Sequence, residues 1–220
     1  MLDPIHDIQQ AYRELVSAFS FPGTVHTLLA EERDLGFATR LPNAVILLSM
    51  ILLDGEVTAY FHCTDDEEQS LIQHLTYVRF KDHASADFVF FPHDMSLDMN
   101  ERKQVLSSVV RGTHQDPHCG ATVALCLPQL PCEIDHYVPG PSSTVLELSG
   151  PGIETKTFLL FSDNTNSEYS QNLLWWVGPR NTLCEEFPLG IEMILFDTRS
   201  RVVVIPRSTY VRPFYCEEGL

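Results

Sequence analysis

The segment 187–211, FPLGIEMILFDTRSRVVVIPRSTYV, contains two apolar runs on either side of a charged turn. The runs are EMILF (192–196) and RVVVI (201–205). Because a short turn brings the two runs side by side in opposite directions, the segment predicts an antiparallel pair of strands. Consecutive apolar positions in both runs are typical of strands that are covered on both faces. The segment therefore predicts a sheet with helices on its two sides.

Similar runs alternate with helical patterns along the rest of the chain. Apolar residues recur at spacings of three and four from Ile5 to Phe19, which predicts an amphipathic helix. Strands are expected at 24–29, 56–63, 87–91, 121–127, 144–150 and 155–161, and further helices at 42–54, 64–77, 100–109 and 171–177. The intermixed order predicts an α/β protein, a three-layer α/β/α sandwich on a mixed sheet, in which residues 1–220 form one domain.

Local signals mark the ends of two helices. Asp3 and Pro4 suit the start of the first helix, and Phe21-Pro22-Gly23 predicts its end, because proline cannot continue a helix and glycine permits a sharp turn. Thr64 and Glu67 have the spacing of a capping box at the start of a second helix.

Two segments are expected to lie outside the regular elements. Residues 131–144 include three prolines and one glycine, which predicts a surface loop too short to link two domains. Residues 212–220 are expected to form a C-terminal tail.

The charge of the chain excludes several classes of partner. Thirty acidic residues against 14 basic ones give a formal charge of −16, which repels nucleic acid and anionic membrane surfaces. A local basic pocket for a small anion is compatible with this total. No apolar stretch is long enough to span a bilayer, no signal-peptide pattern is present, and the six scattered cysteines suit reduced thiols. The expected location is the cytoplasm.

The sequence contains residues of the types found in zinc sites and in Schiff-base sites. The six potential zinc ligands between 114 and 136 include no Cys-x-x-Cys pair, so the spacing argues against a metal site. They are His114, His118, Cys119, Cys126, Cys132 and His136. Of the three lysines, Lys81, Lys103 and Lys156, only the last lies in an expected strand, and a Schiff-base lysine is disfavoured. The sequence predicts no metal, no cofactor and no catalytic residue.

Three weaker candidates for binding remain. Thr113, beside Gly112, lies in a loop that enters an expected strand, a fair position for binding and equally for a structural turn. Trp175 and Trp176 are adjacent on an expected helix, so at most one can face the core fully, and the other is expected to be partly exposed or covered by a partner.

The cluster Pro206-Arg207-Ser208-Thr209 follows the last apolar run. The proline marks a strand end or a sheet edge, and the forked donor of Arg207 suits a carboxylate or main-chain carbonyls. We expect this cluster to fix a corner of the fold, with contact to a partner or a phosphate as the alternative role of Arg207 and Thr209.

Several stretches together resemble the PhnH family, the H subunits of the bacterial carbon-phosphorus (C-P) lyase system. The stretches are AYRELVSAFSFPG (11–23), LLDGEV (52–57), GTHQDPHCGATVAL (112–125), LSGPGI (148–153), FPLGIEMIL (187–195) and IPRSTYV (205–211). They occur in the order of the family and span most of the chain.

The resemblance implies a non-catalytic structural subunit, required for the use of alkylphosphonates. It implies the G, I and J subunits as partners, which convert ATP and an alkylphosphonate to ribose 1-alkylphosphonate 5-triphosphate and then cleave the C-P bond. It also implies a homodimer in isolation and a fold similar to the pyridoxal-phosphate-dependent transferases without their cofactor. The alternative is an enzyme or ligand-binding subunit whose small-anion or nucleotide pocket contains Arg207, Thr113 or His118.

Overall fold

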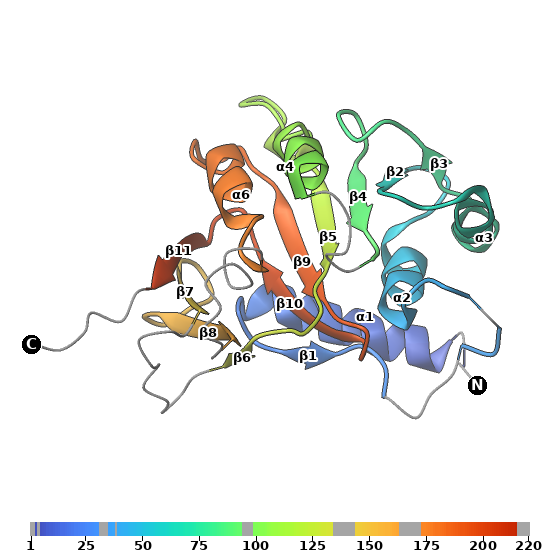
Figure 1. Cartoon of the computed structure of the whole chain (residues 1–220), viewed down its shortest axis with the longest axis horizontal. Coiled ribbons are helices and arrows are strands. Elements are labelled where there is room, and N and C mark those ends of the chain that lie inside the picture. Colours follow the sequence, from blue (N-terminus) through green and yellow to red (C-terminus); the bar gives the residue numbers. More distant parts are fainter. Residues whose placement is uncertain are drawn as a thin grey trace, which may run out of the picture.

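The computed structural model describes residues 3, 5–30, 35–37, 39–93, 99–133, 144–162 and 173–214. The helices in these ranges are α1 (His6–Ser20), α2 (Asn43–Leu52), α3 (Asp66–Thr76), α4 (Met99–Ser107), the 3-10 helix η1 (Pro117–Cys119) and α6 (Val177–Leu183). The strands are β1 (His26–Thr27), β2 (Thr58–Phe61), β3 (Arg79–Phe80), β4 (Phe88–Phe91), β5 (Thr122–Cys126), β6 (Cys132–Glu133), β7 (Thr144–Ser149), β8 (Thr157–Ser162), β9 (Glu192–Phe196), β10 (Arg201–Ile205) and β11 (Tyr210–Phe214). Figure 1 shows their arrangement.

A seven-stranded mixed sheet lies at the centre, in the order β1-β10-β9-β5-β4-β2-β3. The neighbours from β9 to β3 run parallel, and β10 runs antiparallel to both β9 and β1. The pairing of Val203 with Leu195 confirms the hairpin predicted from the segment 187–211. The α/β class and the mixed sheet are therefore confirmed. The two edge strands, β1 and β3, are each two residues long.

Alternate residues of the central strands enter two separate hydrophobic clusters. On β9, Ile194 and Phe196 join the cluster that contains the buried residues of α1, α2 and α3. Met193 and Leu195 join the other cluster, with α4 and α6. Both faces of the sheet are thus covered, which explains why its strands are apolar at consecutive positions.

A second sheet was not predicted. Four antiparallel strands, in the order β11-β7-β8-β6, form a smaller sheet beside α6 (Figure 1). Leu146, Leu148 and Leu159 of this sheet pack into the cluster that contains α4 and α6. The expectation that 144–150 and 155–161 belong to the main sheet is corrected, because these strands cover its face instead of extending it.

The structure corrects the boundaries of two other elements. The strand expected at 24–29 is limited to β1. The capping box of α3 is formed by Asp65 and Glu68, one residue later than predicted, because Asp65 has the extended backbone that an N-cap needs. The hydroxyl of Thr64 instead donates to the carbonyl of Phe61.

The expected helix 171–177, loop 131–144 and tail 212–220 lie partly outside the described residues. Where they are described, α6 begins only at Val177, β6 occupies part of the expected loop, and β11 continues to Phe214. The strand β11 extends further because its residues pair with β7.

The start of α1 agrees with the prediction for Asp3. Its Oδ1 accepts hydrogen bonds from the N–H groups of Ile5 (2.9 Å) and His6 (3.0 Å). Pro4 lies outside the described residues. No helix in the described ranges is long and apolar enough to cross a membrane.

Candidate functional site

Arg207 joins the turn after β10 to two other segments. Its backbone N–H donates to Glu192 Oε2 (2.9 Å), and its Nε donates to Glu192 Oε1 (2.5 Å). Its Nη1 donates to the carbonyl of Pro117 in η1. The guanidinium thus binds one carboxylate and one main-chain carbonyl, the two acceptors that its forked geometry suits. We call this arrangement the Arg207 corner.

Two glycines allow the backbone to close around this corner. A Cβ at Gly120 would lie 2.2 Å from the carbonyl oxygen of Gly190 and 3.1 Å from Nη1 of Arg207. Gly190 itself has φ +143, a conformation that other residues rarely adopt. Only glycine therefore fits at these two positions without a shift of the backbone.

A pocket of about 600 Å³ lies beside the Arg207 corner, and we call it the basic pocket. Its wall comes from β7, the turn before β8, α6 with the turn that follows it, and residues 207–212. Four cationic side chains line it against two carboxylates: Lys156, Arg180, Arg207 and Arg212, and Glu147 and Glu185. The lining of the basic pocket therefore has a positive formal charge, although the whole chain has a formal charge of −16.

Glu147 neutralises two of these cations. It is buried in β7, where Lys156 Nζ lies 3.0 Å and Arg212 Nη2 lies 2.7 Å from its Oε1. Arg212 faces it directly across the pair of β7 and β11. Burial alone would raise the pKa of Glu147, but the hydrogen bonds from Lys156 and Arg212 outweigh burial and lower that pKa.

Arg180 differs because no carboxylate is bonded to it among the described residues. It is 2% exposed, and its Nη2 donates to the carbonyl of Pro206 (2.7 Å) while Nη1 donates to Asn181 Oδ1 (3.1 Å). Its Nε has no partner in the described part of the chain, and neither does Oγ1 of Thr209, which is 1% exposed. Burial lowers the pKa of Arg180, and the charges of Cys184 and Glu192 offset part of that change.

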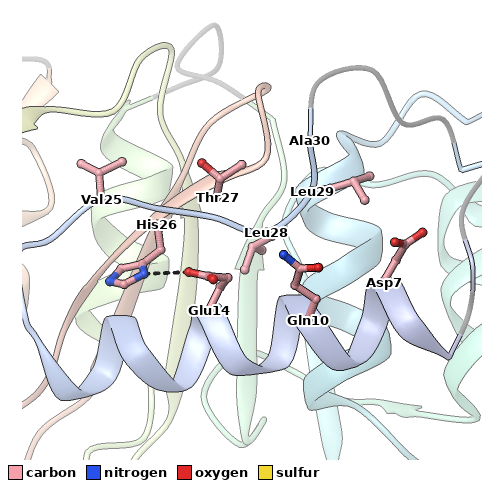
Figure 2. A pocket seen from close by; sticks show the side chains of 9 residues that line it. All are labelled: Asp7, Gln10, Glu14, Val25, His26, Thr27, Leu28, Leu29 and Ala30. Atoms are coloured by element: carbon pink, nitrogen blue, oxygen red, sulfur yellow. Dashed lines mark hydrogen bonds and ion pairs between the residues drawn. The ribbon is translucent and has the colours of Figure 1, made fainter.

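A second concave region lies between α1 and the segment around β1, with a volume of about 410 Å³. We call it the α1–β1 groove. Figure 2 shows Asp7, Gln10 and Glu14 rising from α1 toward this segment. Both ring nitrogens of His26 have partners, Glu14 at 3.0 Å and Thr24 at 2.8 Å. The polar side chains of this groove hold α1 to the edge of the sheet.

The opposite side of α1 carries an exposed apolar stripe. Ile5, Tyr12 and Val16 are 73%, 55% and 45% exposed, and Phe21 just after the helix is 58% exposed. Since each helical residue turns by about 100°, the first three point away from the α1–β1 groove. We call these four residues the α1 stripe.

The tryptophan prediction is wrong. Trp175 and Trp176 are 4% and 0% exposed, and both belong to the cluster that contains α4 and α6. They lie in a turn before α6, where adjacent side chains need not point about 100° apart as they would on a regular helix. Neither residue can serve as an exposed contact in this structure.

Thr113 and His118 lie apart from the basic pocket. Both are exposed, and Thr113 Oγ1 accepts a hydrogen bond from the N–H of Asp116 (3.0 Å), which closes a local turn. The structure therefore brings Arg207 and Thr209 together in one pocket, but it does not add Thr113, Trp175 or Trp176 to them.

The possible zinc ligands are also separated. His114 lies 3.0 Å from Glu186, and Cys126 is buried in β5. No group of three His, Cys, Asp or Glu side chains suited to a metal occurs among the described residues, which exclude His136 and the side chain of Cys132.

Sequence reasoning missed Arg180, Glu147 and the α1 stripe. Glu147 had a signal, since it is the one charged residue in the apolar run TVLELS. The stripe was also readable, because Tyr12 and Val16 widen the apolar face of α1 beyond what one sheet can cover. No sequence signal marks Arg180, since its burial depends on packing between α6 and the turn after β10.

The fold and its surface define an α/β protein with a basic pocket beside a second sheet and an unpaired apolar stripe on its first helix. The chain belongs to the PhnH family, described as bacterial phosphonate metabolism protein, whose family model matches residues 1–212. It is similar to HtxG of Stutzerimonas stutzeri, whose curated name describes it as a C-P lyase subunit protein. The two chains are 26% identical over 205 residues, which cover 92% of this chain and 85% of HtxG. The resemblance seen in the sequence motifs is confirmed.

Proposed function

We propose that this protein is a non-catalytic structural subunit of a C-P lyase core complex that serves alkylphosphonate utilisation in the cytoplasm. Its family is one of phosphonate metabolism, and the name of HtxG describes a C-P lyase subunit. In this proposal the G, I and J subunits carry out the ribosyl transfer from ATP and the cleavage of the C-P bond. This chain supplies surface for their assembly.

The observation that carries the proposal is the α1 stripe. Tyr12 and Val16 are exposed on α1, and Ile5 and Phe21 are exposed directly before and after it. Exposed aromatic and aliphatic side chains grouped on one surface are typical of a protein interface. The stripe replaces the tryptophan pair as the candidate contact, and a second copy of the chain would use the same surface in a homodimer when the subunit is isolated.

The proposed likeness to pyridoxal-phosphate-dependent transferases extends to the fold and not to the cofactor. Lys156, the lysine in the best position for a Schiff base, is bonded to buried Glu147, and its side chain is 48% exposed. A Schiff-base lysine works from a desolvated pocket, whereas Lys156 is half-exposed and bonded to a carboxylate. This contact supports a chain that does not use the cofactor.

The test is co-expression with the G, I and J subunits, followed by affinity capture and native mass spectrometry. Stoichiometric recovery is expected for the wild type, and the double variant Tyr12→Glu/Val16→Glu should lose at least about tenfold of the captured partners, because it places two charges in the contact. Tyr77→Glu is the control, since Tyr77 is 77% exposed at the end of α3, outside the stripe.

Failure of the wild type to recover any of the three subunits would contradict the proposal. Equal recovery by the stripe variant and the control would reject the stripe as the contact. The second candidate function is binding of a small anion, which the buried and incompletely bonded Arg180 favours.

A further inference from the structure

The basic pocket contains a buried cation, Arg180, that is bonded to no carboxylate within the described chain. Lys156 and Arg212 share Glu147, and Arg207 is bonded to Glu192. Arg180 has only neutral acceptors, the carbonyl of Pro206 and the side chain of Asn181. Glu192, the carboxylate near enough to raise its pKa, already accepts two hydrogen bonds from Arg207.

A buried guanidinium with no carboxylate bonded to it lowers the stability of the fold. The loss of hydration is compensated in full only when an opposite charge is bonded directly to the ion. The unbonded Nε of Arg180 adds a further loss of stability, since a buried donor without an acceptor has given up its hydrogen bond to water. Arg180 thus lowers the stability of the fold and lines an open pocket, which indicates that it serves to bind a ligand.

Thr209 supplies a second unmet hydrogen-bonding group in the same pocket. Its hydroxyl is buried and has no partner in the described ranges. Arg180 comes from α6 and Thr209 from the turn before β11, and both line the pocket. A guanidinium and a hydroxyl can both donate hydrogen bonds to the oxygens of a phosphoryl or carboxylate group.

The rim of the pocket is aromatic. Phe187 and Tyr210 line it and are 72% and 76% exposed, so their rings are available to a ligand. The volume of about 600 Å³ is far larger than a bare inorganic anion requires and lies within the range of small-molecule sites. The pocket therefore suits an anionic head joined to a flat organic body.

We propose that the basic pocket binds a small organic oxyanion, with its phosphoryl or carboxylate head at Arg180 and Thr209 and its body against Phe187 and Tyr210. The binding needs no other subunit, so it can be tested on the isolated full-length chain, and its outcome is separate from that of the assembly experiment.

The experiment is isothermal titration calorimetry at constant ionic strength with phenyl phosphate, benzoate, inorganic phosphate and phenol. Saturable binding of phenyl phosphate or benzoate is expected, and the tighter of the two identifies the head group. Each should bind at least about tenfold more tightly than inorganic phosphate or phenol, which lack the body or the charge.

Two variants test the assignment of the head. Arg180→Gln should weaken binding by about 10- to 100-fold, because a hydrogen bond to a charged group is lost. Thr209→Val should weaken binding by about three- to tenfold and should fold normally, since the hydroxyl it removes has no partner. Arg40→Gln, an exposed arginine outside the pocket, should bind as the wild type does.

If Arg180→Gln fails to fold, Thr209→Val alone decides. The proposal is wrong if the wild type binds neither phenyl phosphate nor benzoate saturably, or if the folded variants bind as tightly as the wild type. Equal affinity for inorganic phosphate and phenyl phosphate would overturn the contact with the aromatic rim.

Discussion

The α1–β1 groove and the basic pocket differ in how their polar groups are bonded. In the α1–β1 groove, both nitrogens of His26 are bonded, to Glu14 and Thr24. In the basic pocket, Nε of Arg180 and the hydroxyl of Thr209 have no partner within the described chain. Fully bonded polar groups contribute to stability, whereas unbonded buried ones lower it and are retained for another reason. The bonded groups of the groove thus stabilise the fold, whereas the unbonded groups of the basic pocket are those that we propose bind a ligand.

The largest expected effect tests whether the Arg207 corner is structural. Arg207→Ala should lower the free energy of unfolding by about 3 kcal/mol, because it leaves the partly buried carboxylate of Glu192 without its bonded cation. Urea denaturation measures this change. Arg40→Ala is the matched control, since Arg40 pairs with Asp65 at a site where both side chains are exposed, and a far smaller loss is expected there. Equal effects of the two substitutions would remove the structural role of the corner.

The second prediction concerns the bonded carboxylate of the pocket. Glu147→Gln should cost about 2 kcal/mol at neutral pH, since the charged hydrogen bonds with Lys156 and Arg212 are weakened. The pKa of Glu147 is lower in the folded chain than in the unfolded one. Its contribution is therefore complete above the unfolded pKa, about 4.3, and is lost as the pH falls through the folded pKa.

Urea denaturation at several pH values between neutrality and the acid limit of folding measures this dependence. The difference between wild type and Glu147→Gln should shrink as the pH falls. A difference that stays constant with pH would contradict the assigned role of the Glu147 charge.

The smallest effect compares two threonines directly. Beside the groove, the hydroxyl of Thr24 donates to the carbonyl of Phe21 (2.7 Å) and also contacts His26 of the groove, so Thr24→Val should cost about 1 kcal/mol. In the pocket, Thr209→Val should be neutral or slightly stabilising without ligand, because it removes an unbonded buried hydroxyl. Thermal denaturation of both variants decides the matter, and an equal loss at the two positions would erase the distinction between the regions.

The central sheet was predictable from sequence because its strands carry their own signal. The runs that form β9 and β10 are apolar at consecutive positions and are separated by a short turn. The second sheet was not predictable, since β7 reads as equally apolar, and no local pattern says which sheet a strand joins. The buried face of β7 is set by contact with α4 and α6, which are distant in sequence.

The candidate site was only partly readable for a similar reason. Arg207 was singled out because a forked donor after a strand end has few other uses. The role of Arg180 could not be predicted, because it depends on contacts that only the fold creates. Arg180 donates to the carbonyl of Pro206 and lines the same pocket as Thr209. The predicted exposure of one tryptophan was wrong, because Trp175 and Trp176 lie in a turn and not on a regular helix.

The shortness of β1 and β3 has a consequence for how copies of the chain can associate. Both edges of the main sheet end in strands of two residues, so few main-chain N–H and C=O groups are available there for another strand to pair with. Extension of the sheet into a continuous ribbon across molecules, the usual route to fibrillar aggregation, is disfavoured at both ends. Association through the main sheet is therefore expected to use side-chain surfaces and not strand pairing at its edges.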